Sequence, residues 1–324
     1  MNVIVGVNNE EHKKRAQKDK FPIHEISEAV NKAQFVFLLI SDEIIKDVFE
    51  KKISSNLKKN DTIVFASGYS LAFNSLIPPS NVDILLISPR VPGIGVREGY
   101  LSKKGFFSFV CVHQDVSGNA KQNLLALTKA IGGLRRAAIE VSFKQQAVLS
   151  LFTDQTFTYG FIQIMMRSIL NLIEAGYPPE AIFVELFLSG EGSFTIDKII
   201  DVGMIKQMNF HSQTSQYGQM SRGIKFRKVA NEIGAIQERI FREIENGEFS
   251  QEWEKETSKI KLEIMRYFAS KVNFAKIEES VRKNLGFMKK DMLKEPAYSA
   301  EEKVKAHPEI KEDLDKIKAF YSEL

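Results

Sequence analysis

Residues 35–40 read FVFLLI, an apolar run with the length of a strand that is buried on both faces. Three further runs of this kind follow at 62–66 (TIVFA), 82–88 (VDILLIS) and 106–112 (FFSFVCV). Between the first two, residues 42–57 carry apolar side chains three or four positions apart, which is the spacing of an amphipathic helix. Buried runs that alternate with helices are typical of a parallel sheet covered on both faces. The sequence therefore predicts a doubly wound α/β domain.

The character of the chain changes after about residue 143. Long segments with helical spacing follow at 145–175, at 179–208 with a glycine-rich interruption, and at 229–246. From about residue 250 the chain is rich in Lys and Glu, again with apolar residues every three or four positions. These patterns predict a second, all-helical domain with a helical tail.

Composition limits the function classes. A chain of 324 residues with 44% hydrophobic and 27% charged residues is typical of a soluble globular protein of roughly two domains. The net charge of +4 is too small to indicate a nucleic-acid partner. The single cysteine, Cys111, excludes an intramolecular disulfide and a CxxC metal site. No apolar run approaches the length of a membrane span and no basic leader precedes the strand-like residues 3–5, so we expect a cytoplasmic protein.

Short polar turns follow the predicted strands at residues 6–9, 41–43, 67–70 and 88–93. In a doubly wound sheet these turns meet at the carboxyl edge, where such folds bind nucleotides or anions. Every α/β domain has turns of this kind, so their presence alone does not establish that this chain binds a nucleotide or an anion. No GxGxxG motif follows a strand, and the usual glycine-rich approach to a pyrophosphate is therefore not encoded.

Carboxylates interrupt the apolar helical sequence of the second half. Asp154 and Glu185 are the clearest cases, and Glu191 lies in the glycine-rich interruption. Two inward carboxylates from different helices can hold a hard cation such as Mg²⁺. The alternative is that each lies at a helix surface or end. Between residues 154 and 191 no acidic pair has i, i+4 spacing, and the sequence has no HxH or HxxxH motif, so neither pattern strengthens the metal interpretation.

A series of short segments carries further information: 65–69 (FASGY), 78–83 (PPSNVD), 88–93 (SPRVPG), 114–120 (QDVSGNA), 131–135 (IGGLR), 142–144 (SFK), 151–155 (LFTDQ) and 174–180 (EAGYPPE). In order and spacing, over roughly residues 1 to 255, they resemble ketol-acid reductoisomerase, the Mg²⁺- and NADPH-dependent enzyme family of branched-chain amino-acid biosynthesis. The resemblance implies a Rossmann-like N-terminal domain over 1–141 and a knotted helical domain over 142–255, commonly dimeric, with a helical C-terminal extension over 256–324.

The resemblance also shows departures around the nucleotide. The chain starts at the family's second strand, so we expect the Rossmann-like sheet to lack the first βα unit with its glycine-rich turn. At the positions where the family binds the 2′-phosphate of NADPH with Arg and Ser, this chain has Asn8, Asn9 and Glu10. An acid facing a phosphate is unfavourable. The candidate cofactor-binding residues at the strand ends are Asn8, Asp42, Glu43, Gly68 and Gly93.

The catalytic positions implied by the resemblance have changed as well. The family's histidine is Ser67, its active-site lysine is Arg90, and its substrate-binding serine is Ser212.

Of the metal ligands that the resemblance implies, the first aspartate is Ser150 and the next glutamate is Asp154. On the following helix Glu185 remains, while its partner is Ser189 unless a local shift brings Glu191 there. Two carboxylates offset the charge of two Mg²⁺ ions poorly.

Three hypotheses follow. The first is a catalytically impaired or inactive family member that keeps a scaffold or binding role. The second is an active ketol-acid reductoisomerase, or a related NAD(P)-dependent reductase, with a modified site. The third is a structural or regulatory partner of an authentic reductoisomerase. We expect a homo-oligomer, a dimer through the helical domain, or association with a reductoisomerase, and neither a nucleic-acid nor a membrane partner.

Overall fold

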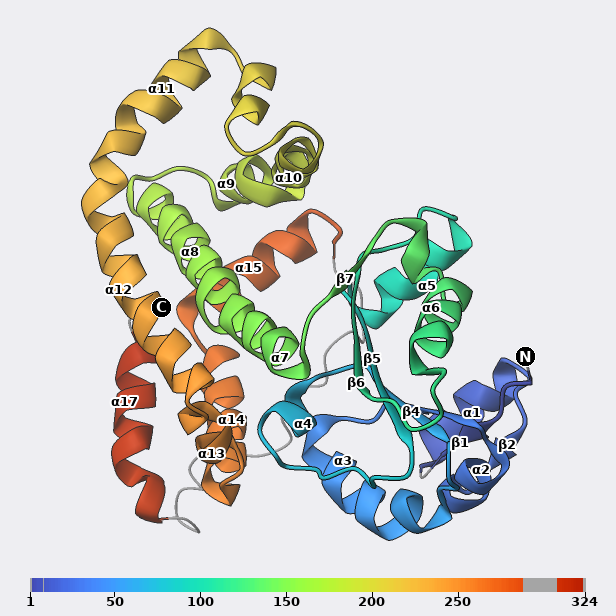
Figure 1. The fold of residues 1–324 in the computed structure, drawn as a ribbon. Coiled ribbons are helices and arrows are strands. Elements are labelled where there is room, and N and C mark those ends of the chain that lie inside the picture. Colours follow the sequence, from blue (N-terminus) through green and yellow to red (C-terminus); the bar gives the residue numbers. More distant parts are fainter. Residues whose placement is uncertain (1, 8, 288–307, 323–324) are drawn as a thin grey trace. The chain divides into compact units, whose positions relative to one another are not determined.

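A computed structural model describes residues 2–7, 9–287 and 308–322. The chain divides into two compact units, Met1–Leu151 and Phe152–Leu324, here called the first and second units. Figure 1 shows their elements coloured along the sequence, with the strands confined to the first unit. The α/β class and the helical C-terminal region predicted from the sequence are thereby confirmed.

The first unit is built around a five-stranded sheet (Figure 1). Its strands are β3 (Phe35–Leu38), β4 (Thr62–Phe65), β5 (Asp83–Pro89), β6 (Ser108–Gln114) and β7 (Ala138–Glu140), and they lie side by side in that order. β3 pairs parallel with β4, β4 with β5, and β6 with β7. Three of the apolar runs that predicted strands, at 35–40, 62–66 and 82–88, thus form adjacent parallel strands.

The pair of β5 and β6 is antiparallel, and this differs from the predicted parallel sheet. Pro89 at the end of β5 lies opposite Ser108 at the start of β6. The connection between them, which contains α5 (Gly93–Leu101), therefore returns to the edge of the sheet that it left. A buried strand has the same apolar composition in either direction, so the run at 106–112 carries no signal of this reversal.

A second, two-stranded sheet precedes the larger one. β1 (Val5–Gly6) pairs parallel with β2 (Ile23–His24) across α1 (Glu10–Lys18). Within the described residues this pair forms no ladder with β3. β2 was not predicted, because two residues are too short to show the alternation of a strand.

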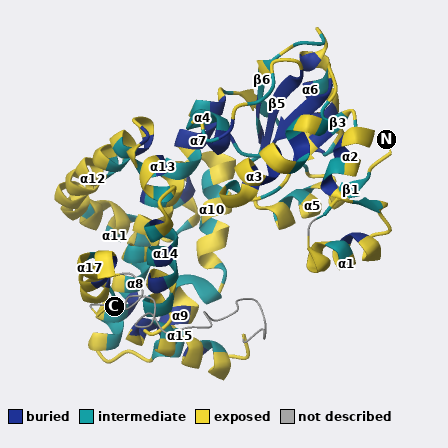
Figure 2. Cartoon of the chain, turned by 90° about the horizontal axis from the view of Figure 1, so that it is seen from below, coloured by how far each residue is buried: buried dark blue, intermediate teal, exposed yellow. Residues whose placement is uncertain are grey.

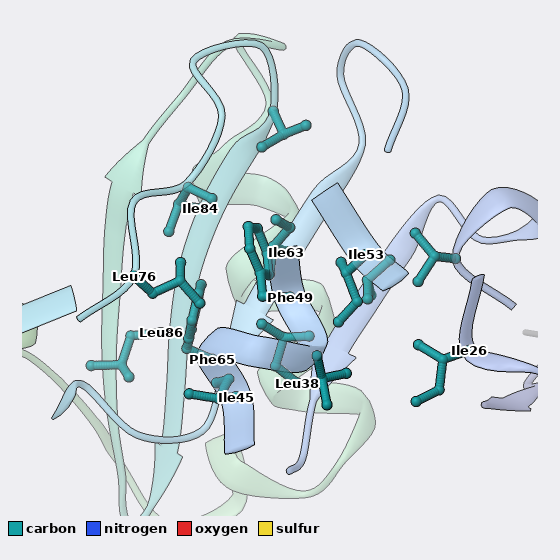
Figure 3. Close-up of a cluster of buried hydrophobic side chains, with 14 of the residues drawn as sticks. Ile26, Leu38, Ile45, Phe49, Ile53, Ile63, Phe65, Leu76, Ile84 and Leu86 are labelled. Carbon is teal, nitrogen blue, oxygen red and sulfur yellow. The ribbon is translucent and has the colours of Figure 1, made fainter. Parts of the chain in front are cut away.

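Helices cover both faces of the large sheet. On one face α2 (Ile26–Lys32), α3 (Asp42–Val48) and the π-helical turn Phe49–Ile53 pack on the side chains shown in Figure 3. On the other, α6 (Ala120–Ala130) covers a separate apolar cluster. Neighbouring residues of β4 supply opposite faces, because side chains alternate along a strand. At about 25 cal/mol per Å² of apolar surface, these two layers are the main source of stability of the unit.

Two helices lie against the carboxyl ends of β4 and β5. α4 (Tyr69–Ala72) follows β4, while α7 (Phe143–Phe152) follows β7, which runs opposite to β4, and is hydrogen-bonded to Gly68 and Arg90. They bring the residues of the candidate site together.

The second unit is helical throughout its described part. Its α-helices are α8 (Tyr159–Glu174), α9 (Pro179–Phe183), α10 (Glu191–Val202), α11 (Gln213–Gly223), α12 (Arg227–Glu245), α13 (Glu248–Trp253), α14 (Glu256–Ala269), α15 (Asn273–Asn284) and α17 (Lys311–Ser322). π-helical turns at Thr153–Thr158 and Val184–Leu188 adjoin α8 and α9. Over the described ranges, no helix is both long enough and apolar enough to cross a membrane.

Two apolar clusters hold this unit together. One joins α8 and α9 to α15 through Ile169, Phe183 and Val281. The other joins α14 to α17 through Ile264 and Leu314. By contrast, α11 and α12 are exposed along most of their length (Figure 2).

Candidate functional site

A hollow of about 280 Å³ opens where β3 and β4 end. Residues 38–42, Ile45 and residues 65–67 line it. The predicted turns 41–43 and 67–70 thus meet at the carboxyl edge of the sheet, as expected for parallel neighbours. The lining is apolar except for the residues that follow each strand, so polar recognition in the hollow depends on those turns.

Asp42 is the half-buried acid of this hollow. It stands in the first turn of α3, and the Ser70 hydroxyl donates a hydrogen bond to its Oδ1 at 3.5 Å. Burial raises the pKa of the Asp42 carboxyl, the charge of Glu43 raises it further, and the bond from Ser70 acts in the opposite direction. Glu43 itself is exposed.

The turn between β4 and α4 is fixed by a residue of α7. The backbone N–H of Gly68 donates to Oε1 of Gln146 at 2.5 Å, and Gln146 is only 3% exposed. A Cβ at Gly68 would lie against the carbonyl oxygen of Phe143 and 2.8 Å from that same Oε1. Glycine is therefore required here by close approach to α7, and the neighbouring Ser67 is held where β4 ends. Sequence reasoning selected Ser67 and Gly68 but missed Gln146.

Arg90 lies at the end of β5 and is exposed. Its guanidinium donates to the hydroxyls of Ser88 and Ser150, both at 3.3 Å, and stands 4.8 Å from the centre of the Phe109 ring. Within the described residues Arg90 forms no ion pair. Gly93, the last candidate at this edge, begins α5 with no atom within 4 Å of a Cβ placed on it.

The candidate metal ligands of the second unit lie on three different elements. Asp154 stands in the turn Thr153–Thr158, Glu185 in the turn Val184–Leu188, and Glu191 in the first turn of α10; all three are exposed. Across the described residues, no group of three or more His, Cys, Asp or Glu side chains is placed to hold a metal. Within the described part of one chain, these three carboxylates therefore belong to no cluster of three or more potential metal ligands.

The last two candidates give little further information. Ser212 is the N-cap of α11, where its hydroxyl accepts from the Ser215 N–H at 3.2 Å, so its position has a structural reason of its own. Asn8 lies outside the described residues. Its neighbour Asn9 caps α1 by accepting from the His12 N–H.

Comparison with known proteins identifies the family. The family model for the acetohydroxy acid isomeroreductase NADPH-binding domain matches residues 1–137, and that for the ketol-acid reductoisomerase C-terminal domain matches 143–287. The ketol-acid reductoisomerase (NADP(+)) of Petrotoga mobilis is 33% identical over 255 residues, which cover 78% of this chain and 76% of that protein. A relative from Saccharolobus solfataricus is 36% identical over 259 residues with the same coverage.

A solved structure gives the same result. The NADH-preferring ketol-acid reductoisomerase from an uncultured archaeon superposes with a TM-score of 0.78 at 28% identity, over 87% of this chain and 85% of that one. The family implies NADPH binding and an oxidoreductase scaffold. The resemblance inferred from the sequence motifs is confirmed, and the chain belongs to the ketol-acid reductoisomerase family.

Proposed function

We propose that this chain is a ketol-acid reductoisomerase homologue in which the family reaction is impaired or lost and a scaffold or binding role is kept. The family reaction combines a Mg²⁺-dependent alkyl migration with reduction of a 2-acetohydroxy acid by NADPH. One observation carries the proposal: Ser150, where the resemblance places a metal-binding aspartate, is hydrogen-bonded to Arg90, where it places the active-site lysine.

The first argument concerns charge at the metal position. A serine hydroxyl is neutral, and the arginine beside it adds a positive charge, so this pair repels a divalent cation where a carboxylate attracts it. Of the other implied ligands, Ser189 is neutral, Asp154 is one methylene shorter than glutamate, and Glu185 is unchanged, so fewer carboxylates remain than the resemblance implies. Mg²⁺ binding is expected to be weak.

The second argument concerns proton transfer. Lysine can give up a proton when its environment lowers its pKa, whereas the guanidinium of arginine stays protonated. Arg90 is exposed and remains a fixed cation, so it does not replace a lysine that acts as an acid.

The third argument concerns the nucleotide. Glu10 and Glu11 form the first turn of α1, next to the end of β1, and Asp42 and Glu43 line or flank the hollow between β3 and β4. Carboxylates near a bound phosphate reduce its affinity through Coulomb repulsion. We therefore propose that NADPH binds weakly, although the family implies this cofactor.

The decisive test is turnover by the full chain. With saturating 2-acetolactate, NADPH and Mg²⁺, we expect no NADPH oxidation above background from protein shown to be folded by circular dichroism. The double variant Arg90→Lys, Ser150→Asp puts back the lysine and the aspartate that the resemblance implies at these two positions. Its turnover is compared with that of the wild type under the same conditions. Wild-type turnover of about 1 s⁻¹ or more, within the range of ordinary enzymes, would overturn the proposal.

We also propose that the chain forms a homodimer through its helical region. Val229, Ile233 and Ile236 recur three or four positions apart along α12, and Ile236 is 55% exposed. Monomeric proteins rarely expose a continuous apolar stripe of this length. Light scattering should give twice the mass of the chain, and Ile236→Glu should give monomers, whereas Glu232→Gln on the same helix should not. A monomeric wild type that binds an authentic reductoisomerase would favour a heteromeric partner instead.

A further inference from the structure

We propose that the first unit carries a binding surface for single-stranded nucleic acid, formed by the end of α5, the turn after it and the stretch before β7. Two segments, residues 97–107 and 129–136, supply six basic side chains and a single acid, Glu98. Their net charge of +5 exceeds the +4 of the whole chain, so all other residues together carry −1. The total charge predicted no nucleic-acid partner because it averages this cluster with the slightly acidic remainder.

Backbone contacts bring the two segments side by side. Arg135 donates through Nη1 to the carbonyl oxygen of Tyr100 at 2.7 Å. The Gly105 N–H donates to the Gly99 carbonyl oxygen at 2.9 Å, which folds the turn back on α5. A Cβ at Gly105 would lie 2.5 Å from the Cβ of Arg135, so the turn and the stretch before β7 are in close contact. The basic residues of both segments thus belong to one region of the unit.

The cations of this region are not neutralised by neighbouring acids. All six are exposed, and among the described residues none of them forms an ion pair with a carboxylate. They are Arg97, Lys103, Lys104, Lys129, Arg135 and Arg136. Like charges close together repel one another, and a chain of phosphates relieves several of these repulsions at once. A polyanion is therefore a better match than a single small anion.

Two exposed rings lie among these charges. The Arg135 guanidinium is 4.9 Å from the centre of the Tyr100 ring, and that of Arg136 is 5.4 Å from the centre of the Phe107 ring. Tyr100 is 45% exposed and Phe107 44%. The Phe107 carbonyl oxygen accepts from the Arg90 N–H at 2.8 Å, so the backbone that carries this ring is fixed. Unpaired bases stack on aromatic faces and arginine planes, which selects a single strand among the polyanions.

A lipid surface fits these observations less well. Helices that bind membranes combine basic residues with a broad apolar face. α5 has nine residues, of which three are glycine, and its apolar and polar positions show little separation onto opposite faces. The stacking of both rings with arginine is likewise a feature of base recognition and not of insertion into lipid.

The test is fluorescence anisotropy of a labelled oligouridylate of about 12 nucleotides, titrated with the full chain at several salt concentrations. We expect a Kd between about 1 and 100 µM at physiological salt. The logarithm of the binding constant should fall with the logarithm of salt concentration at a slope of roughly −3, as for about four phosphates neutralised on a single strand.

Two double variants separate the contribution of the charges from that of the rings. Lys103→Gln with Lys104→Gln should weaken binding at least about tenfold and make the salt slope shallower by about 1.4, because two phosphate contacts are lost. Tyr100→Leu with Phe107→Leu keeps apolar side chains but removes both stacking faces. It should weaken binding at least about fivefold and leave the salt slope unchanged.

The matched control is Lys13→Gln with Lys14→Gln, which removes the same charge from α1 and should bind as the wild type does. An equal loss in this control would assign binding to overall charge and overturn the inference. Unchanged binding by the ring variant, in protein with the circular dichroism of the wild type, would reject a nucleic-acid surface in favour of a general polyanion surface.

Two further outcomes would also overturn the inference. One is the absence of saturable oligouridylate binding up to about 100 µM protein. The other is binding to phosphatidylserine vesicles without binding to the oligouridylate, which would identify a membrane surface. None of these measurements involves turnover or a residue of the candidate site, so the proposed function is tested separately.

Discussion

The candidate residues of the first unit are held by distant parts of the chain, whereas those of the second are held by their neighbours. Gly68 is bonded to Gln146 across 78 positions, and Arg90 to Ser150 across 60. In the second unit, Ser212 bonds to a residue three positions away. Hydrogen bonds between elements fix a side chain only when the tertiary fold is formed, whereas local ones form within a single helix. The site at the strand ends is therefore a product of the fold.

The two units also differ in how far their apolar residues are buried. The strands of the first unit are enclosed, and Ile63, Ile84 and Leu85 are fully buried. Along α11 and α12 of the second unit most residues are exposed, which Figure 2 marks in yellow, and the apolar residues Tyr217, Met220 and Ile236 are among them. The first unit encloses its apolar strands, while the second exposes apolar side chains along α11 and α12, the surface on which the proposed dimer contact lies.

The largest expected effect comes from removing a buried ring of the first unit. Phe65→Ala should lower the free energy of unfolding by about 3–5 kcal/mol, because Phe65 is 1% exposed and its truncation leaves a cavity. Phe161→Ala on α8, where the ring is exposed, should cost less than about 1 kcal/mol. Urea unfolding followed by circular dichroism measures both. An equal loss at Phe161 would mean that its surface is covered in solution, and the comparison would fail.

A smaller effect is expected at the turn fixed by α7. Gly68→Ala should destabilise the protein by about 1–3 kcal/mol, since the added methyl meets the Phe143 carbonyl. Gly93→Ala is the matched control, because nothing lies within 4 Å of its Cβ position. Thermal unfolding compares the two. If both variants melted with the wild type, close packing of the β4–α4 turn on α7 would be disproved.

A still smaller loss of stability is expected at Ser212, the N-cap of α11, whose hydrogen bond is local. Ser212→Ala should cost about 1 kcal/mol, the usual contribution of an N-cap serine. Ser221→Ala, near the other end of the same helix, should cost less because its hydroxyl is not a cap. Denaturant midpoints at matched protein concentration test this. A loss at Ser212 as large as that at Phe65 would point to tertiary contacts of this serine.

The smallest expected effect is a dependence on pH at Asp42. Its pKa is raised in the folded state by burial and by Glu43, so the folded protein holds a proton that the unfolded chain releases. Stability should therefore fall as pH rises from the ordinary value of 3.8 through the raised pKa, and then stay level. Asp42→Asn should melt higher than the wild type at pH 7, with the difference shrinking towards pH 4. A constant difference at every pH would contradict the assigned cause.

The sequence predicted most of the first unit because its signals are local. The apolar runs at 35–40, 62–66 and 82–88 became β3, β4 and β5, and the spacing at 42–57 became α3 and the turns after it. The direction of β6 was missed because strand direction depends on where a connection returns. Gln146 was missed for a related reason: a polar residue in a helix gives no sign that its partner is a backbone N–H far away.

The sequence was sufficient to predict which strand ends form the candidate site. It was not sufficient to predict the hydrogen bonds between the residues of the site. Ser67, Asp42 and Arg90 each follow a recognisable strand, so their edge of the sheet could be named. The bond from Arg90 to Ser150 could not, because hydrogen bonding between residues 60 positions apart depends on the packing of α7. For the second unit, three metal ligands were predicted from the sequence, and the described residues contain no group of three or more His, Cys, Asp or Glu side chains placed to hold a metal.

The division of the first unit into two sheets has a consequence for proteolysis. Among the described residues, β1 and β2 share no ladder with β3; α2 packs on this pair, with Gly6 close to Ala29 and Ile26, and also on the apolar cluster of the large sheet. We expect opening of the α2 contact to release the N-terminal segment while the five-stranded sheet stays intact, at a lower free energy than global unfolding. Trypsin should cut first among the lysines and arginines of α1, and the strand layer should survive as a resistant fragment.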